Sequence, residues 1–387
     1  MSSQTSSGPT REDYTIGWLC TLPIESAAAA EMLDEEYPPL AVLPGDTNSY
    51  VLGGIGQHRV VMACMGGTGG MMAHSVATNL TKSFPNVREI LMVGIGAGIP
   101  SEEYDVRLGD VVVSEAKGRF AAVVQCDFGK DETDGFQVTG GLNQPSESLV
   151  RATGAVKRNR LRNRSQIHRL VRHFDGDVLD PEGWRYQGRE NDPLHELDQE
   201  PRKPKKCAEC ATRQEEYMPD PEVHYGVVVS GNHAIKNSGV RDRVRDEVGA
   251  CCIETEAFGI MNQFPCLVIR GVCSYTDENQ NHRWQQYAAL TAAAYAKELS
   301  LELPLTEQAP KVSEEIHNVT RRLVDIQLEL KELKSQQEET ATLLRAFTRD
   351  TEFERVLQWS SPPEASSDTK PTKKNSCEGT NAWLLEG

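Results

Sequence analysis

The sequence has no apolar run long enough to cross a bilayer, because glycine, proline or charge interrupts every run well before the ~20 residues that a spanning helix needs. The first thirteen residues, MSSQTSSGPTRED, include neither a basic start nor an apolar stretch, so we expect no signal peptide. Cations are scarce, since 41 Lys and Arg stand against 57 Asp and Glu, and the formal net charge is −16. Such a surplus of negative charge repels phosphates. We therefore expect no binding to nucleic acid or to a membrane surface.

Aromatic residues make up an ordinary 6% of the 387 residues, and the ten cysteines are scattered. Several cysteines lie in apolar segments, which is typical of reduced thiols in a cytoplasmic protein. Cys207 and Cys210 supply half of a tetrahedral zinc site, and His195, His224 or a further cysteine would have to complete it. The alternative is an incidental pair of reduced thiols. We expect no cofactor.

Short β-branched runs alternate with helical stretches from Tyr14 onward, whereas residues 1–12 are polar and predicted to be disordered. The β-like runs cover residues 14–22, 59–65, 89–93, 110–114, 224–230 and 266–275. Runs that are apolar on both faces and separated by helices indicate a three-layer α/β sheet. The sequence therefore predicts an α/β domain over residues 13–303.

Residues 151–222 do not follow this alternation, and we predict an insertion in the sheet domain. Its first part, residues 151–173, contains eight Lys or Arg residues and no acid, and Pro-, Asp- and Lys-rich sequence follows. One interpretation is a solvated basic helix with a loop. The other is a cationic lid over an anionic substrate, such as the phosphates of a nucleotide.

After Pro310 the pattern changes to alternating spacings of four and three. The apolar seam has two polar members and consists of Val312, Ile316, Val319, Leu323, Ile326, Leu330, Leu333, Gln337, Thr340, Leu344 and Phe347. This period predicts a coiled coil over residues 311–350, and a lone amphipathic helix packed on its own domain is the alternative. Residues 351–387 are expected to be a flexible linker or tail.

Acidic residues and glycines occur next to the predicted strands, where binding or catalytic groups are expected. Two glycine-rich stretches, residues 66–70 and 94–98, follow β-like runs, where exposed N–H groups can bind an anion or a ribose. Glu254 and Glu256 lie two apart within apolar sequence, so in a strand or turn they point to one side. They could form a salt bridge with Arg270 or Arg107, or accept hydrogen bonds from sugar hydroxyls. Glu25 is a third acid at a strand end, and ligands of doubly wound sheets bind at such ends.

Four ordered segments carry a resemblance to a known family. They are YTIGWLCTLPIESAAA, MVGIGAGIP…VRLGDVVVS, HYGVVVSGN, and IETEAFGIM…CLVIRGVCSYTDENQNHRWQQYAALTAAAYAKEL. Together they resemble the purine nucleoside phosphorylase/nucleosidase superfamily, and within it the fungal branch at the N-terminus of NOD-like receptor proteins. The resemblance implies an α/β/α fold with a central mixed sheet. The final residues, NSCEGTNAWLLEG, resemble the segment that leads into the nucleotide-triphosphatase module of such receptors.

The resemblance also implies roles for individual residues. Glu25 matches the glutamate that orients or activates the attacking water, and Glu256 matches the acid that binds the ribose hydroxyls beside Glu254. Thr255 stands where a methionine usually lines the ribose. The remaining matches are a sugar-side turn at Gly94, Gly96, Ala97 and Gly98, and a cradle for the base at Ser230, Asn232 and Ile235.

The departure from the family pattern is Ser274. Purine-cleaving members place an aspartic acid there to protonate the leaving base, and general acid catalysis is commonly worth about 10²–10⁴-fold. A serine hydroxyl can donate a hydrogen bond but is too weak an acid to give up its proton at neutral pH. Activity could be reduced, could use Asp277 further along, could suit a base that needs less protonation, or could be lost.

The resemblance favours hydrolysis of an N-ribosyl bond in a purine nucleoside or nucleotide. Hydrolysis is favoured over phosphorolysis because Glu25 is retained and no arginine set for a phosphate nucleophile is evident. An alternative from another class is a catalytically weakened ligand-binding module that signals by assembly. A third is an oligomerising scaffold whose acids form core salt bridges. We expect a small-molecule ligand, a cytoplasmic location, and a homo-oligomer formed through the α/β domain, the heptad helix or both.

Overall fold

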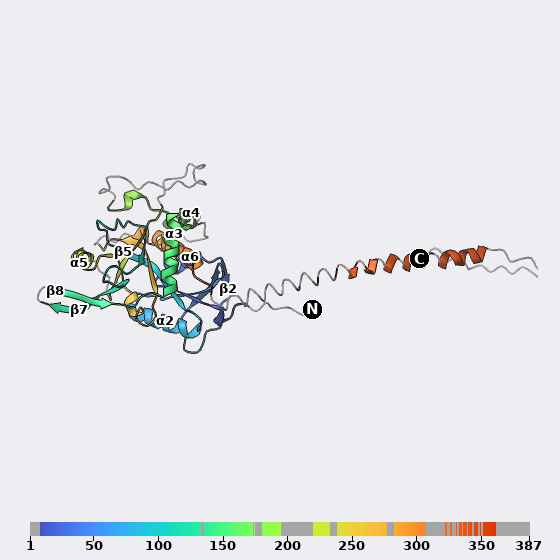
Figure 1. Cartoon of the computed structure of the whole chain (residues 1–387), viewed down its shortest axis with the longest axis horizontal. Coiled ribbons are helices and arrows are strands. Elements are labelled where there is room, and N and C mark those ends of the chain that lie inside the picture. Colours follow the sequence, from blue (N-terminus) through green and yellow to red (C-terminus); the bar gives the residue numbers. More distant parts are fainter. Residues whose placement is uncertain are drawn as a thin grey trace, which may run out of the picture. The chain divides into compact units, whose positions relative to one another are not determined.

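The computed structural model describes residues 8–132, 135–172, 174, 180–194, 220–232, 238–276 and 282–305, then fifteen single positions between 322 and 349, and residues 351–360. The chain divides into two compact units, Met1–Val312 and Ser313–Gly387. The first unit is an α/β domain, and several of its strands and helices are labelled in Figure 1. Four residues with predicted site roles lie outside the described residues: Asp277, Ile235, Cys207 and Cys210.

The described part of the first unit is built on an eleven-stranded sheet with the order β2-β3-β4-β1-β5-β11-β6-β9-β7-β8, and β10 pairs with both β5 and β9. Strands β1, β4, β5 and β11 are parallel neighbours, whereas β6 is antiparallel to β11 and β10 is antiparallel to β5. The predicted central mixed sheet is confirmed. The strands are β1 (Ile16–Cys20), β2 (Glu35–Tyr37), β3 (Tyr50–Ile55), β4 (His58–Cys64), β5 (Glu89–Gly98), β6 (Val111–Ser114), β7 (Val123–Glu132), β8 (Gly135–Gly141), β9 (Val223–Ser230), β10 (Ala250–Glu254) and β11 (Leu267–Ser274).

Helices pack on this sheet, and the longest of them in the first unit, α6, is buried along almost its whole length. Its alanines allow close approach: a Cβ placed on Gly271 of β11 would come within 1.8 Å of the Ala288 carbonyl oxygen of α6. The helices are α1 (Pro23–Ala30), α2 (Gly70–Ser83), α3 (Glu147–Leu161), α4 (Ile167–Arg172), α5 (Ser238–Val248) and α6 (Gln285–Leu301), with short 3-10 turns η1 (Arg11–Asp13), η2 (Pro181–Trp184), η3 (Arg189–Asn191), η6 (Ala257–Gly259) and η7 (His282–Trp284).

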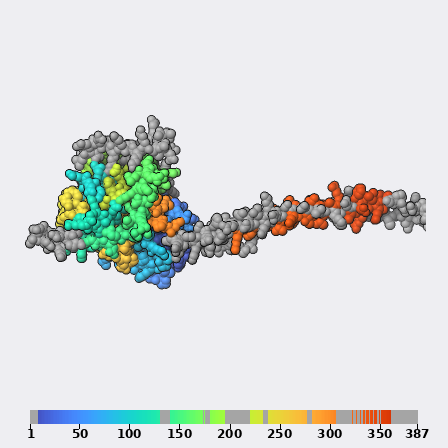
Figure 2. Space-filling model, viewed as in Figure 1, coloured from blue at the N-terminus to red at the C-terminus, as the bar shows by residue number. Residues whose placement is uncertain are grey.

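Helix α3 begins before the predicted insertion and belongs to the domain. Its inner face buries Leu149, Ala152 and Val156, while its outer face forms part of the surface in the space-filling view (Figure 2). A fully solvated basic helix is therefore the wrong description. The helix is amphipathic, and the run of cations in its sequence conceals an apolar stripe at spacings of three and four.

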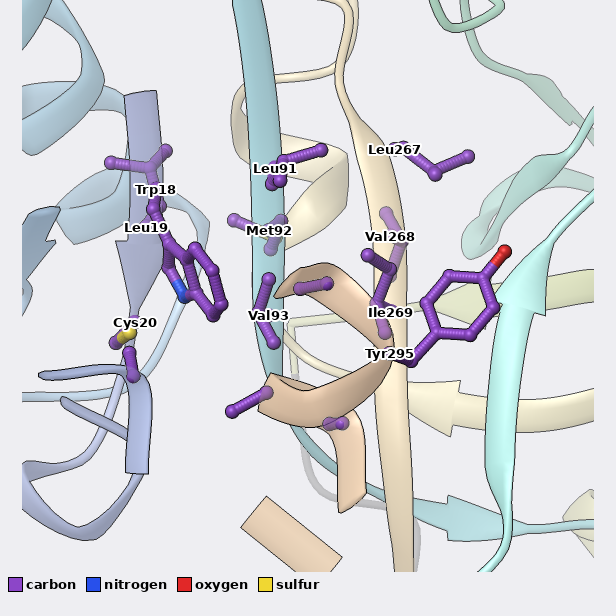
Figure 3. Close-up of a cluster of buried hydrophobic side chains, with 14 of the residues drawn as sticks. Trp18, Leu19, Cys20, Leu91, Met92, Val93, Leu267, Val268, Ile269 and Tyr295 are labelled. Atoms are coloured by element: carbon purple, nitrogen blue, oxygen red, sulfur yellow. The ribbon is translucent and has the colours of Figure 1, made fainter. Parts of the chain in front are cut away.

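The core lies between α6 and the central strands. Side chains of β1, β5 and β11, including Trp18, Met92 and Ile269, pack side by side, and Tyr295 of α6 lies against them (Figure 3). These strands carry apolar residues on both faces because helices cover both sides of the sheet. The polar groups described next lie just after β1 and along the middle of β5 and β11.

The second unit is helical at every described position from Arg322 to Ser360. The prediction of a linker from residue 351 is wrong for residues 351–360, which are helical. The segment TEFERVLQWS holds good helix formers, and its apolar members Phe353, Val356 and Leu357 recur at spacings of three and four.

Candidate active site

Glu25 lies in the first turn of α1, directly after β1, and its carboxylate is almost fully buried, with 4% of the residue exposed. Oε2 accepts hydrogen bonds from the backbone N–H groups of Thr21 (2.7 Å) and Leu22 (2.8 Å). Oε1 accepts one from the N–H of Ile95 in β5, at 2.7 Å. Burial raises the pKa of Glu25, while the neighbouring Arg270 and the three N–H groups oppose the rise. The carboxylate thus joins the segment after β1 to the second half of β5.

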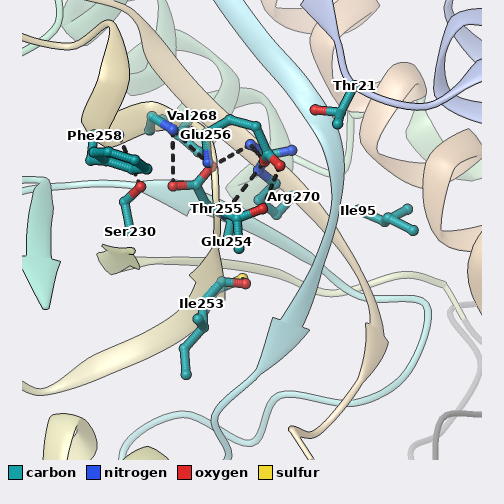
Figure 4. A network of polar contacts seen from close by, with 12 residues as sticks. Thr21, Ile95, Ser230, Ile253, Glu254, Thr255, Glu256, Phe258, Val268 and Arg270 are labelled. Carbon is teal, nitrogen blue, oxygen red and sulfur yellow. Dashed lines mark hydrogen bonds and ion pairs between the residues drawn. The ribbon is translucent and has the colours of Figure 1, made fainter. Parts of the chain in front are cut away.

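Arg270 is the centre of the site. It lies in the middle of β11 with 1% of its side chain exposed, and Nη2 donates to Glu254 Oε2 at 2.5 Å and to Glu256 Oε2 at 3.0 Å (Figure 4). The predicted salt bridge is therefore formed with Arg270. The other candidate, Arg107, is bound instead to Asp105.

Two glycines of β5 make room for this cluster. A Cβ on Gly94 would lie 2.4 Å from Glu25 Oε1 and 2.6 Å from Arg270 Nη1, so both charged groups lie against the same bare backbone. A Cβ on Gly96 would meet the Cys252 thiol at 2.8 Å. Gly94, Gly96, Ala97 and Gly98 belong to strand β5 rather than to the expected turn. Small residues are needed here because side chains from β11 and α1 fill the space above the strand.

The two acids of the E-x-E sequence have different environments. Glu254 accepts hydrogen bonds from the backbone N–H groups of Glu256 (3.0 Å) and Ala257 (3.1 and 3.2 Å), as well as from Arg270. Burial raises its pKa, and the Arg270 charge opposes the rise. Glu254 therefore holds the turn after β10 in shape. Glu256 accepts from Arg270 and from the hydroxyl and the backbone N–H of Thr255. A carboxylate has about four acceptor sites, so one remains for a ligand.

The segment expected to cradle the base lies at the same end of the sheet. Ser230 is the last residue of β9 and is in register with Glu254 of β10. Its hydroxyl accepts a hydrogen bond from the N–H of Phe258 at 2.9 Å. The N–H of Asn232 donates to Asp127 of β7 at 2.8 Å. Ser230 therefore joins the acid-bearing turn to the expected base side.

Ser274 ends β11 and is in register with Ala97 of β5. The following Tyr275 is anchored from two sides: its hydroxyl donates to Asp192, with distances of 2.9 and 3.0 Å to the two oxygens, and Arg241 Nη1 donates to its carbonyl at 3.2 Å. Thr276 then adopts a positive φ of 60°, which is unusual for a β-branched residue. The strand tip that carries Ser274 is thus held in place by residues from α5 and from the inserted region.

The described cations of α3 do not lie over this site, so the lid interpretation does not hold for them. The hydroxyl of Ser146, at the start of α3, bonds to Glu89, the first residue of β5, whereas the carboxylate cluster lies further along that strand. Lys157 is paired with Glu115 at 2.5 Å. These contacts place the described part of α3 toward the amino-terminal end of β5.

No group of three metal-binding side chains exists among the residues that the structure describes. His224, one of the candidates to complete a zinc site, is hydrogen-bonded through Nε2 to Asp110 at 2.9 Å. No helix in the described part of the chain is long and apolar enough to cross a membrane.

The central position of Arg270 was not anticipated from the sequence, which indicated it only as a salt-bridge partner. The available signal was an arginine inside the apolar run CLVIRGV, because a buried cation needs anionic partners. The Tyr275–Asp192 hydrogen bond could not be predicted from the sequence, because no sequence pattern relates the two segments that contain these residues.

The sequence profile of the family described as the phosphorylase superfamily matches residues 15–303. The chain belongs to this superfamily. The chain is 41% identical over 291 residues to a nucleotide-binding leucine-rich repeat (NLR)-like protein of Hyaloscypha variabilis, covering 74% of this chain and 29% of that relative. The chain thus spans less than a third of that relative's length. The predicted resemblance to this superfamily and to NOD-like receptors is confirmed.

One further relative, and one solved structure that superposes on this chain, are enzymes by name. A 5′-methylthioadenosine/S-adenosylhomocysteine nucleosidase of Mycobacterium bovis is 25% identical over 301 residues, covering 75% of this chain and 97% of the relative. Among solved structures, the futalosine hydrolase of Helicobacter pylori superposes with a TM-score of 0.49 at 17% identity, over 75% of this chain and 99% of that one.

Proposed function

We propose that this phosphorylase-superfamily domain hydrolyses the N-ribosyl bond of a purine nucleoside or nucleotide. The observation that carries the proposal is that Glu25 and Arg270 meet beside Gly94 and that Arg270 also binds Glu256. In this proposal Glu25 orients and deprotonates a water molecule, and Glu256 accepts hydrogen bonds from the ribose hydroxyls. Ser230 and Asn232 border the base, and Arg270 holds the acids in place.

The charges of the cluster support hydrolysis over phosphorolysis. Three carboxylates (Glu25, Glu254 and Glu256) surround one guanidinium, and Arg270 Nη2 already binds two of them. A surplus of negative charge stabilises the positive charge that develops on the sugar as the glycosidic bond breaks. The same surplus repels a phosphate nucleophile.

Ser274 supports a second candidate function, a nucleoside- or nucleotide-binding module with weakened catalysis. Aspartate at this position would protonate the base. Ser274→Asp is therefore expected to raise the rate of base release by about 10²-fold or more. Chromatography of free adenine, with adenosine and ATP as separate substrates, measures this rate. Ser274→Asn is the matched control, because it resembles the aspartate in shape but is not an acid.

The outcomes separate the two functions. Adenine release by the wild type at the rate of Ser274→Asp would show that serine suffices. Thermal stabilisation by adenosine or ATP, without adenine release from either protein, would favour the binding module. If adenine is not released and neither adenosine nor ATP stabilises the protein, both functions are contradicted.

We further propose that the domain is the effector part of a cytoplasmic fungal immune receptor that assembles through its C-terminal helix. The NLR-like relative supports the receptor context, and the free thiols of the described cysteines are compatible with the cytoplasm. Four described seam residues are at least half exposed in the single chain: Ile326 (50%), Leu330 (59%), Leu333 (61%) and Leu344 (59%). In a coiled coil of two or more copies these side chains would be buried as knobs in holes.

Replacing a seam residue with an acid is therefore expected to dissociate the assembly. Leu330→Glu would place a carboxylate in the interface, and light scattering after size-exclusion chromatography should show a smaller mass than that of the wild type. Thr342→Glu is the matched control and should keep the wild-type mass, because Thr342 lies at the heptad position opposite the seam and is exposed. An unchanged mass for Leu330→Glu would exclude the seam as the interface.

A further inference from the structure

Thr21 follows β1 and is 2% exposed, and its backbone N–H donates to Glu25. Its hydroxyl, however, has no hydrogen-bond partner among the described residues. In Figure 4 the Thr21 oxygen is drawn on the side of the residue toward Arg270 and Glu256, with the ribbon of a strand between them in this view. Thr21 is therefore a buried polar group at the edge of the carboxylate cluster, with a bonding capacity that the protein itself does not use.

A buried hydroxyl without a partner destabilises the fold, so such groups normally bind an ordered water molecule or a ligand. Arg270 provides an independent second observation, because its Nε is also buried without a partner among the described residues. One unpartnered donor adjoins Glu25, the other belongs to the arginine that binds Glu254 and Glu256, and Glu25 and Arg270 meet beside Gly94. This arrangement indicates that a small polar species belongs beside Glu25. Glu25 can serve as its acceptor, since Oε1 receives one backbone N–H and keeps a free lone pair.

We propose that the Thr21 hydroxyl holds the attacking water molecule together with Glu25, which makes Thr21 a further catalytic residue. This inference rests on the hydrolytic function proposed above. The water molecule donates one hydrogen to Glu25 and receives the Thr21 hydroxyl hydrogen on one lone pair. Its other lone pair then forms the bond to the anomeric carbon as the bond to the base breaks. Glu25 takes the proton from the water, and the base leaves with the bonding electrons and takes up a proton from solvent.

Thr21→Val tests the inference, because valine keeps the β-branched shape and the backbone N–H to Glu25 but lacks the hydroxyl. Loss of one hydrogen bond of about 0.5–1.5 kcal/mol corresponds to a kcat for adenosine hydrolysis that is lower by roughly 2- to 10-fold. KM is expected to stay constant, since Thr21 contacts the water and not the sugar. Thr21→Ser should restore kcat.

Thr78→Val is the matched control. Thr78, on α2, also has a buried hydroxyl oxygen without a partner among the described residues, yet it lies in the second half of that helix. Its removal should leave kcat unchanged. An unchanged kcat in Thr21→Val, or a Thr21→Ser protein as slow as Thr21→Val, would overturn the role of the hydroxyl.

A high-resolution crystal structure of the whole chain gives a readout that does not depend on turnover. We expect an ordered water molecule about 2.7 Å from both the Thr21 hydroxyl and the Glu25 carboxylate, and its loss in Thr21→Val. Adenine release by a wild-type protein that lacks this water would overturn the inference and leave the proposed function standing. If the crystal of the wild-type protein contains this water but the protein releases no adenine, the proposed function is refuted, while the water site beside Thr21 and Glu25 is supported.

Discussion

Replacing Arg270 with methionine is expected to lower the free energy of unfolding by about 3–5 kcal/mol at pH 7, because removing one partner of a buried ion cluster leaves uncompensated charge. Arg270 is 1% exposed and donates to Glu254 and Glu256, with Glu25 close by. Methionine fills a similar volume but gives these acids no positive charge. Urea unfolding of the full chain, followed by tryptophan fluorescence, measures the change.

The loss should depend on pH in a defined direction. Without Arg270 the pKa of Glu254, already raised by burial, rises further in the folded protein. A raised carboxyl pKa gives stability that is present below the unfolded value of about 4.3 and lost as the pH rises through the folded value. The variant should therefore approach the wild type in stability as the pH falls from 7 toward 4.5.

The surface arginine Arg245 provides the control for this substitution. It pairs with Asp242 and Asp246 on α5, where both acids are substantially exposed. Arg245→Met is expected to change stability by less than about 1 kcal/mol, because exposed ion pairs contribute little. If Arg270→Met lost no more stability than Arg245→Met at pH 7, the three acids would not depend on Arg270. If Arg270→Met failed to fold, Arg270→Lys would test whether charge alone rescues the domain.

Glu25→Gln is expected to lower kcat for adenosine hydrolysis by about 10²–10⁴-fold, the range typical for loss of a general base. Glutamine keeps the size of the side chain but cannot take a proton from water. KM should change little, because Glu256 and the base-side residues remain. Chromatographic measurement of adenine release tests both statements.

The pH profile of the wild type gives a second test of Glu25. Because burial raises its pKa, the carboxylate is lost at a pH above the ordinary glutamate value of about 4.3 as the solution is acidified. The acid limb of kcat should therefore lie above that pH.

Glu298→Gln is the matched control for Glu25→Gln, since Glu298 too is a buried glutamate with a raised pKa but bonds to Ser165 and Gln166. Equal losses in Glu25→Gln and Glu298→Gln would remove the special role of Glu25.

Much of the α/β domain could be predicted from the sequence because local patterns specify it. The β-branched runs around residues 14–22, 89–93 and 266–275 became the central strands, since a strand covered on both faces needs apolar residues throughout. The helix over residues 351–360 was missed even though its spacing of three and four is visible, because the proline-rich sequence after it suggested a linker. Helix α3 was misread because its many cations obscured the apolar stripe.

The candidate site could be predicted only in part. Glu25 and Glu256 were predicted from strand-end positions and from the family resemblance, and the structure brings both to Arg270. The roles of Glu254 and Arg270 could not be separated from sequence, because both depend on which backbone N–H groups and which strands lie beside them. The part of Ser274 and of Asp277 in catalysis stays a prediction.

By itself, the sequence determined where strands and helices form and which acids stand at their ends, because periodicity and turn chemistry act between residues close in the chain. The tertiary structure decided that β11 lies beside β5, so that Arg270 is opposite Gly94, and that β10 returns antiparallel against β5. Glu25 then reaches the same glycine, Gly94, from α1. Such a buried charge cluster depends on strand order and register across distant segments, and no local pattern encodes these.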